Sequence, residues 1–331
     1  MAGEDGMTTV LVVGGAGYIG AHCCLDLATK GHVPVVYDNL SNGHEEFVRW
    51  GPLETGDLHD RDRLREVVSR HRPEAIIHFA ALAEVGLSLL DPLSFYDNNV
   101  RGTISLLAVA AEAGIDKFVF SSTCATYGVP ETTPMAEEHG QRPINPYGRS
   151  KLMVEQILAD LDAYRGFRSV ALRYFNAAGA DEEGRIGEWH DPETHAIPIA
   201  IEAAMGRRAG FTVNGTDYDT RDGTCIRDFI HVMDLADAHT RALEYLQAGG
   251  ASAAVNLGTG TGTSLKELLA VVKEVSGRDF AVSWGGRRAG DPPSLVADNR
   301  KAKALLGWTP KRSLEDIVAS AWRWHSGRNA G

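Results

Sequence analysis

Tyr147 and Lys151 stand four residues apart and together could move a proton. Pro146, a residue type favoured at the first position of a helix, precedes them, and a helical pattern continues to about Leu161. Side chains four residues apart lie on the same face of a helix. A nearby ammonium favours the phenolate, so we expect Lys151 to lower the pKa of Tyr147 and make it a proton acceptor. The alternative is a surface tyrosine and lysine without a role, because this spacing also arises by chance.

Small hydroxyl side chains at 121–123 follow a strand-like apolar run at 117–120. Doubly wound sheets bind their ligands at the carboxyl ends of the strands, which is where these hydroxyls would lie. Thr123 could relay a proton between a substrate and Tyr147. The alternative is a strand-end hydroxyl that bonds only to backbone, and it suits Ser121 better than Thr123.

A glycine-rich turn at 14–20 follows the first strand-like run and precedes a helical segment. Its glycines stand where a backbone must approach a pyrophosphate, and Asp38 ends the second strand-like run 18 residues after Gly20. A purely structural turn is the alternative, but this context predicts a dinucleotide site. Asp38 could accept hydrogen bonds from both adenosine ribose hydroxyls, and its charge would repel a 2′-phosphate. We therefore expect NAD rather than NADP.

Two other loops carry weaker signals. Asp57 could hold the adenine edge or could equally be a loop or cap aspartate. A second glycine cluster at 258–262 follows another strand-like run and could be a phosphate loop. It lacks a lysine at its end, and Ser264 and Glu267 have the spacing of a capping box. We favour a structural turn that leads into a helix.

These groups require a scaffold of strands that alternate with helices, and the sequence supplies one. Such alternation predicts an α/β fold, a doubly wound parallel sheet of Rossmann type, with a smaller C-terminal α/β substrate lobe. We expect a disordered leader at 1–9, the dinucleotide-binding domain at 10–180 and the substrate lobe at 181–331, with some of the chain crossing between lobes. The expected strands are 10–13, 33–37, 75–79, 117–120 and 169–173, the expected helices include 64–69 and 104–113, and a loop-rich region spans 181–197.

Composition excludes several classes of protein. The chain has 331 residues and a net charge of −11, which disfavours binding to nucleic acid or to an anionic membrane. No apolar run is long enough to span a membrane and no signal peptide is recognisable, so we expect a cytoplasmic protein. The four cysteines are neither dense enough for a disulfide framework nor spaced for zinc, and we expect no metal. These cysteines are Cys23, Cys24, Cys124 and Cys225.

From residue 10 to about residue 324 the sequence resembles the extended short-chain dehydrogenases/reductases, and within them the UDP-glucose 4-epimerase (UDP-galactose 4-epimerase) group. A series of motifs is more specific than any one of them. The motifs that carry the resemblance are 14–20, 38–39, 56–57, 78–81, 96–100, 121–123, 147–151, 173–176, 227–231 and 288–291.

The resemblance implies an NAD-dependent enzyme that inverts carbon 4 of a UDP-sugar through a transient 4-keto sugar, and UDP-glucose and UDP-galactose are the favoured substrates. It implies that Thr123, Tyr147 and Lys151 are catalytic, and that a homodimer forms through a four-helix interface. The implied cofactor-binding residues are Gly14, Gly17, Tyr18, Ile19, Gly20, Asp38, Asn39, Asp57, Leu58, Phe79, Ala80, Ala81, Asn98, Ser121, Tyr147, Lys151 and Tyr174. The implied substrate-binding residues are Thr123, Tyr147, Asn176, His195, Ala196, Thr212, Asn214, Arg227, Arg288, Asp291 and Leu295, with the two arginines on phosphate.

Departures from the family pattern leave alternatives open. Ala83 stands where many members carry a lysine that contacts the cofactor. This change and the 121–128 stretch also resemble members that act on UDP-xylose and UDP-arabinose. Leu295 stands where glucose/galactose enzymes often have tyrosine, so a 2-acetamido sugar such as UDP-N-acetylglucosamine also fits. Two rivals are a nucleotide-sugar 4,6-dehydratase, which would carry Asp-Glu where Cys124 and Ala125 stand, and a non-catalytic NAD sensor.

Overall fold

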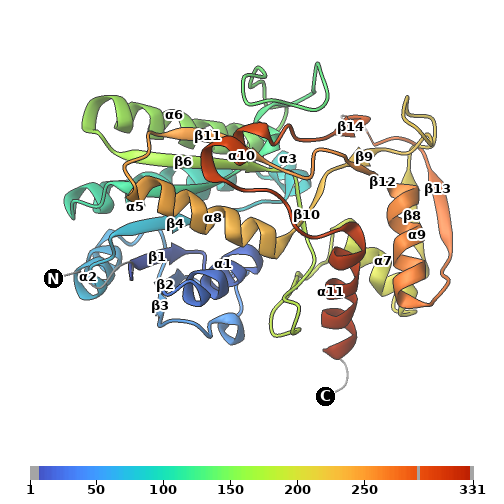
Figure 1. Ribbon diagram of the computed structural model, residues 1–331, viewed down its shortest axis with the longest axis horizontal. Coiled ribbons are helices and arrows are strands. Elements are labelled where there is room, and N and C mark those ends of the chain that lie inside the picture. Colours follow the sequence, from blue (N-terminus) through green and yellow to red (C-terminus); the bar gives the residue numbers. More distant parts are fainter. Residues whose placement is uncertain (1–6, 289–290, 329–331) are drawn as a thin grey trace.

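The computed structural model describes residues 7–288 and 291–328. Its main feature is a sheet of seven parallel strands in the order β11-β6-β5-β4-β1-β2-β3 (Figure 1). This is the doubly wound sheet that the sequence predicts. The strands are β1 (Thr9–Val13), β2 (Val33–Asp38), β3 (Leu53–Thr55), β4 (Ala75–His78), β5 (Lys117–Thr123), β6 (Arg168–Tyr174) and β11 (Ala253–Leu257).

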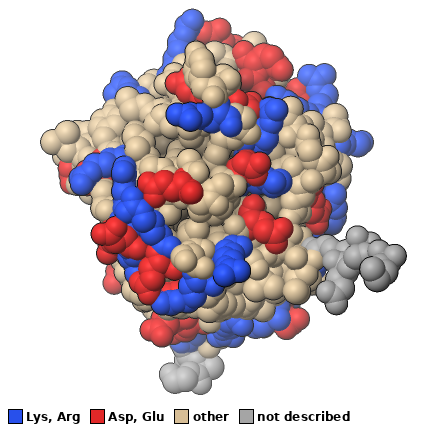
Figure 2. Space-filling model, turned by 90° about the vertical axis from the view of Figure 1, so that its left-hand side faces the viewer, with Lys and Arg blue, Asp and Glu red and all other residues tan. Residues whose placement is uncertain are grey.

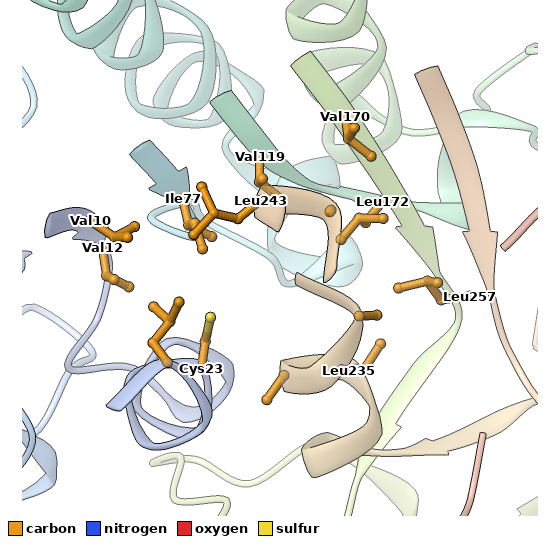
Figure 3. Close-up of a cluster of buried hydrophobic side chains, with 14 of the residues drawn as sticks. Val10, Val12, Cys23, Ile77, Val119, Val170, Leu172, Leu235, Leu243 and Leu257 are labelled. Atoms are coloured by element: carbon orange, nitrogen blue, oxygen red, sulfur yellow. The ribbon is translucent and has the colours of Figure 1, made fainter. Parts of the chain in front are cut away.

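Helices cover both faces of this sheet, because successive side chains of each strand point to opposite faces. Val10 and Val12 face Cys23 of α1 and Leu243 of α8 in one buried cluster (Figure 3), whereas Leu11 belongs to the cluster on the other face. One face is covered by α1 (Tyr18–Thr29), α8 (Val232–Gln247) and α10 (Arg300–Leu306), and the other by α2 (Arg61–His71), α5 (Thr103–Glu112) and α6 (Pro146–Arg165).

The helix α6 carries the predicted proton-transfer pair and begins as predicted, at Pro146. Asn145 precedes it and caps it, since its Oδ1 accepts the backbone N–H of Gly148 at 2.8 Å. The helix runs four residues beyond the predicted end at Leu161 and stops at Gly166, whose φ of 67° closes it in the left-handed region. Both ends therefore have a local physical cause.

A second lobe has its own buried core of α7 (Ala196–Ala204), α9 (Leu265–Ser276) and α11 (Leu314–Gly327). Small sheets adjoin it: β8 (Phe211–Asn214) with β13 (Val282–Gly285), β7 (Asn176–Ala178) with β10 (Phe229–His231), and β9 (Ile226–Arg227) between β12 (Thr263–Ser264) and β14 (Ser294–Leu295). The chain crosses between lobes, because α8, β11 and α10 follow residue 181 in sequence and pack in the large sheet's layers. Residues 1–6 of the predicted leader lie outside the described residues, and Thr9 already opens β1.

Short helices complete the structure, most of them beside α6. They are η1 (Glu45–Phe47), α3 (Val85–Leu90), α4 (Pro92–Tyr96), the π-helix η2 (Asp97–Gly102) and η3 (Cys124–Thr126). Among the residues that the structure describes, no helix is long and apolar enough to cross a membrane. On the face shown in Figure 2, acidic and basic side chains alternate and do not gather by sign.

Candidate active site and cofactor site

The glycine-rich turn of residues 14–20 joins β1 to α1 at the carboxyl edge of the large sheet. The strand order reverses here, which is where such sheets bind ligands. Gly14 has φ 80°, and a Cβ on it would lie 2.5 Å from the backbone nitrogen of Ala80. A Cβ on Gly20 would lie 2.2 Å from the carbonyl oxygen of Gly14. Side chains are excluded at both positions, so the backbone stays open to a pyrophosphate at the start of α1.

Asp38 ends β2 beside this turn and is buried. Its Oδ2 accepts the backbone N–H of Ala16 and its Oδ1 accepts that of Leu40, each at 2.9 Å. Burial raises the pKa of this carboxyl, and the two hydrogen bonds lower it in part. Each carboxylate oxygen has a further lone pair, so Asp38 can still accept hydrogen bonds from ribose hydroxyls. Together the turn and this carboxylate fit NAD.

The remaining predicted cofactor residues surround this edge. Asn39 donates to Oδ2 of Asp57 at 2.9 Å, which places both next to Asp38. The hydroxyl of Tyr18 donates to the carbonyl oxygen of Gly179 at 2.6 Å and so ties α1 to the second lobe. Ile19 lies in the first turn of α1, Leu58 is buried beyond Asp57, Phe79, Ala80 and Ala81 follow β4, and Asn98 lies in η2.

Lys151 reaches from α6 to the end of β5, where Ser121 stands. Its Nζ donates to the carbonyl oxygen of Ser121 at 2.8 Å, and the hydroxyls of Ser121 and Tyr174 are 2.7 Å apart. Burial lowers the pKa of Lys151 to about 7, although Glu155 acts to raise it. The ammonium can therefore exchange a proton near neutral pH.

Tyr147 lies one turn earlier on α6 and faces Thr123. Burial is the main cause that raises the pKa of Tyr147, Tyr174 adds to it, and a hydrogen bond from Thr123 lowers it. The expectation that Lys151 lowers this pKa is therefore wrong for the chain by itself, because burial is the largest effect and raises the pKa. The predicted meeting of Thr123, Tyr147 and Lys151 at the end of β5 is found.

A cavity of about 470 Å³ adjoins the second lobe. Its lining includes predicted residues and also Glu188, Arg208 and Phe229, which were not predicted from the sequence. A hollow of about 560 Å³ between α2 and α5 is lined by none of the predicted site residues. The predicted substrate residues that line the 470 Å³ cavity are Asn176, His195, Ala196, Thr212, Asn214, Arg227, Arg288 and Asp291.

Arg227 and Asp291 form an ion pair at the wall of this cavity. Arg227 also donates to the carbonyl oxygen of Pro292 at 3.0 Å. Leu295 pairs with Arg227 in the register of β14 and β9 and packs in a cluster beside Cys124. Residues 289–290 of the predicted motif lie outside the described residues. Arg227 and Asp291 thus hold each other in position at the wall of the cavity.

The second glycine cluster is a structural turn, as favoured. The carboxylate of Asp228 accepts hydrogen bonds from the backbone N–H groups of Thr259 and Gly260 at 2.7 and 3.1 Å. These amides therefore already bind a side chain of the protein in the place of a phosphate. Ser264 and Glu267 form the predicted capping box at the start of α9.

Comparison with known proteins gives the family. Residues 10–258 match the NAD dependent epimerase/dehydratase family. The chain is 66% identical over 329 residues to a UDP-glucose 4-epimerase of Rhizobium leguminosarum bv. trifolii, and the match covers 99% of both. The chain belongs to the UDP-glucose 4-epimerase group. The resemblance inferred from the sequence is confirmed, and so, at the level of the family, is NAD as cofactor.

Comparison with solved structures supports the same family. A UDP-glucose 4-epimerase from Brucella ovis in complex with NAD is 52% identical, with a TM-score of 0.94 over 96% of this chain and 98% of that one. A UDP-glucose-4-epimerase from Stenotrophomonas maltophila, with bound NAD and formylated UDP-arabinopyranose, is 38% identical, with a TM-score of 0.96 over 98% and 99%.

One further residue of the epimerase site escaped sequence reasoning. Glu155 lies one turn beyond Lys151 on α6, and its carboxylate accepts hydrogen bonds from Ser122 at 2.5 Å and from Arg173 at 2.6 Å. The four-residue step from Lys151 was the available signal. Ala83 is exposed in the loop after β4.

Proposed function

We propose that this epimerase interconverts UDP-glucose and UDP-galactose, with Tyr147 as the group that takes and returns the proton of the sugar 4-hydroxyl. The observation that carries this proposal is the meeting of Tyr147, Thr123 and Lys151 at the end of β5, beside the dinucleotide turn. Asp38 and the turn of 14–20 would hold NAD, which would supply reversible hydride transfer at carbon 4 with no net redox change.

Each residue of the site has a separate role. Asp38 and the turn of 14–20 hold the adenosine and pyrophosphate. Tyr147 accepts the proton of the sugar hydroxyl, Thr123 relays this proton between the sugar oxygen and Tyr147, and Lys151 holds the ribose and supplies charge near neutral pH. A buried phenol is a poor base alone, so Tyr147 requires a nearby positive charge, which the oxidised nicotinamide of NAD would supply.

The UDP part of the substrate belongs in the 470 Å³ cavity. This volume is within the range of small-ligand sites. Arg227 and Arg288 would hold the phosphates because a guanidinium presents a fixed fork of donors, and Asp291 would accept a ribose hydroxyl. UDP would then stay in place while the keto-sugar turns to present its other face.

The choice of sugar rests on the shape of the pocket. Leu295 is smaller than tyrosine and leaves room for a 2-acetamido substituent on the sugar. A related epimerase was solved with a formylated UDP-arabinopyranose, so this family includes a protein that binds a pentose nucleotide. UDP-xylose/UDP-arabinose and UDP-N-acetylglucosamine are therefore the rival substrates. A 4,6-dehydratase is disfavoured because Cys124 and Ala125 cannot supply its acid and base.

We further propose a cytoplasmic homodimer. Leu89, Leu90 and Leu93 on α3 and α4 are 62%, 83% and 78% exposed, and Ile104 of α5 and Met153 of α6 are exposed as well. An apolar surface of this kind favours a partner copy. The cysteines, all free, suit a reducing compartment.

The test is to incubate the purified protein separately with UDP-galactose, UDP-xylose and UDP-N-acetylglucosamine and to resolve the 4-epimers by chromatography. We expect conversion of UDP-galactose, and loss of at least a hundredfold in kcat for Tyr147→Phe with UDP binding retained. Tyr164→Phe is the matched control, because Tyr164 lies on the same helix and is 81% exposed. Conversion of no sugar nucleotide, with NAD supplied, would refute the proposal.

A further inference from the structure

Four potential metal ligands gather in the loop before α7. They are Glu188, His190, Glu193 and His195, and one ligand atom from each lies within 4.8 Å of all the others. All four come from one eight-residue segment, so the loop itself forms the cluster. Our expectation of no metal came from the spacing of the cysteines, which says nothing about histidine and glutamate.

The distances within the cluster fit a small cation. Nδ1 of His195 is 2.9 Å from Glu188 and 3.3 Å from Glu193, and Nδ1 of His190 is 3.6 Å from each of the two carboxylates. Zinc bonds of about 2.0–2.2 Å in a tetrahedron separate neighbouring ligand atoms by roughly 3.3–3.6 Å. The four side chains therefore lie close enough together to share one small cation.

The burial of the two carboxylates and the charge of the cluster also favour a cation, whereas His190 and His195 are 31% and 51% exposed. The side chains of Glu188 and Glu193 are 4% and 5% exposed. Nδ1 of His190 is buried and has no hydrogen-bond partner. Two neutral imidazoles and two carboxylates carry a charge of −2, which one divalent ion balances. Protonated imidazoles are the competing way to neutralise the carboxylates.

The surroundings hold the ligands in place. Oε1 of Glu193 accepts the backbone N–H groups of Thr194 and His195, both at 2.8 Å. The carbonyl oxygen of Glu188 accepts Nε1–H of Trp324 at 2.9 Å, and the ring of Trp189 stacks on that of His44 at 3.9 Å. Such outer contacts orient metal ligands.

We propose that Glu188, His190, Glu193 and His195 form a structural site for a divalent ion of the zinc class, which fixes the 188–195 loop against the substrate cavity. Protein atoms supply all four ligands, which is typical of structural zinc sites. Since Glu188 and His195 also line the cavity, the ion stabilises its wall without touching the reacting atoms.

The test is a titration of the metal-free protein with Co²⁺, which gives strong visible absorption bands in a tetrahedral site, followed by displacement with Zn²⁺. We expect one saturable equivalent in the wild type. His190→Gln and Glu193→Gln should each weaken binding at least tenfold. The control is His59→Asn. His59 also lies near two carboxylates, at 2.7 Å from Asp57 and 3.3 Å from Asp97, but outside the cluster. This variant should bind Co²⁺ as tightly as the wild type does.

The proposal is overturned if the wild type shows no saturable binding, or if the folded His190→Gln and Glu193→Gln proteins bind as tightly as the wild type. A crystal of wild-type protein soaked in Zn²⁺ gives a second measurement that needs no variant. An anomalous peak between the four side chains supports the site, and no peak there refutes it. Neither readout depends on epimerase activity.

Discussion

At the scale of single residues, burial controls the acid–base chemistry of this site. Tyr147 and Lys151 share a helix face, yet burial raises the pKa of the first and lowers that of the second to about 7. Each shift favours the uncharged form. Burial therefore disfavours the charged form of both groups, and Lys151 still exchanges its proton near neutral pH.

Lys151 should make stability depend on pH. Its pKa is about 7 when folded and 10.5 when unfolded, so above pH 7 the unfolded chain binds more protons and stability rises with pH up to about 10.5. Between pH 6 and pH 9, this lysine should raise the free energy of unfolding of the wild type by roughly 2 to 3 kcal/mol. Urea unfolding at the two pH values measures the change. Lys151→Met should lack the increase, and Lys117→Met, at the other end of β5, should keep it. Equal slopes for wild type and Lys151→Met would contradict the account.

Asp38 should decide between the two dinucleotides. Asp38→Ser removes the charge that repels a 2′-phosphate, so NADP should bind at least about tenfold tighter, which is 1.4 kcal/mol. NAD should bind more weakly, because its adenosine ribose hydroxyls lose a charged acceptor. Calorimetric titration of cofactor-free protein measures both. Asp62→Ser, at a side chain 95% exposed, is the control and should change neither affinity.

At the scale of elements, a buried ion pair fixes α6 against β6. The side chains of Arg173 and Glu155 are 6% and 8% exposed, and the carboxylate also accepts from Ser122 and Gln141. Breaking such a pair leaves a buried charge uncompensated, so Glu155→Gln should lower the free energy of unfolding by about 3–5 kcal/mol. Glu112→Gln breaks an exposed pair with Arg65, which solvent screens, and should leave the free energy of unfolding nearly unchanged. Denaturant unfolding compares the two, and similar losses would refute the assignment.

At the scale of the whole molecule, assembly should depend on the exposed leucines of α3 and α4. Leu90→Glu combined with Leu93→Glu places two charges in the proposed dimer surface, and sedimentation should show a monomer where the wild type is a dimer. Leu87→Glu, at 43% exposure on α3, is a milder comparison. A wild type that sediments as a monomer would contradict the proposed dimer.

The sequence by itself determined the doubly wound sheet, the glycine-rich turn after its first strand and the shared helix of Tyr147 and Lys151. These depend on local rules: the alternation of apolar runs, glycines at 14, 17 and 20, and the four-residue step from Tyr147 to Lys151. Only the tertiary structure decided the pKa directions, because burial depends on every element that packs around a group. The Arg227–Asp291 pair and the 470 Å³ cavity were likewise decided there, since they join segments far apart in the chain. The cluster of two glutamates and two histidines is local in sequence, but only the folded loop turns all four side chains toward one point.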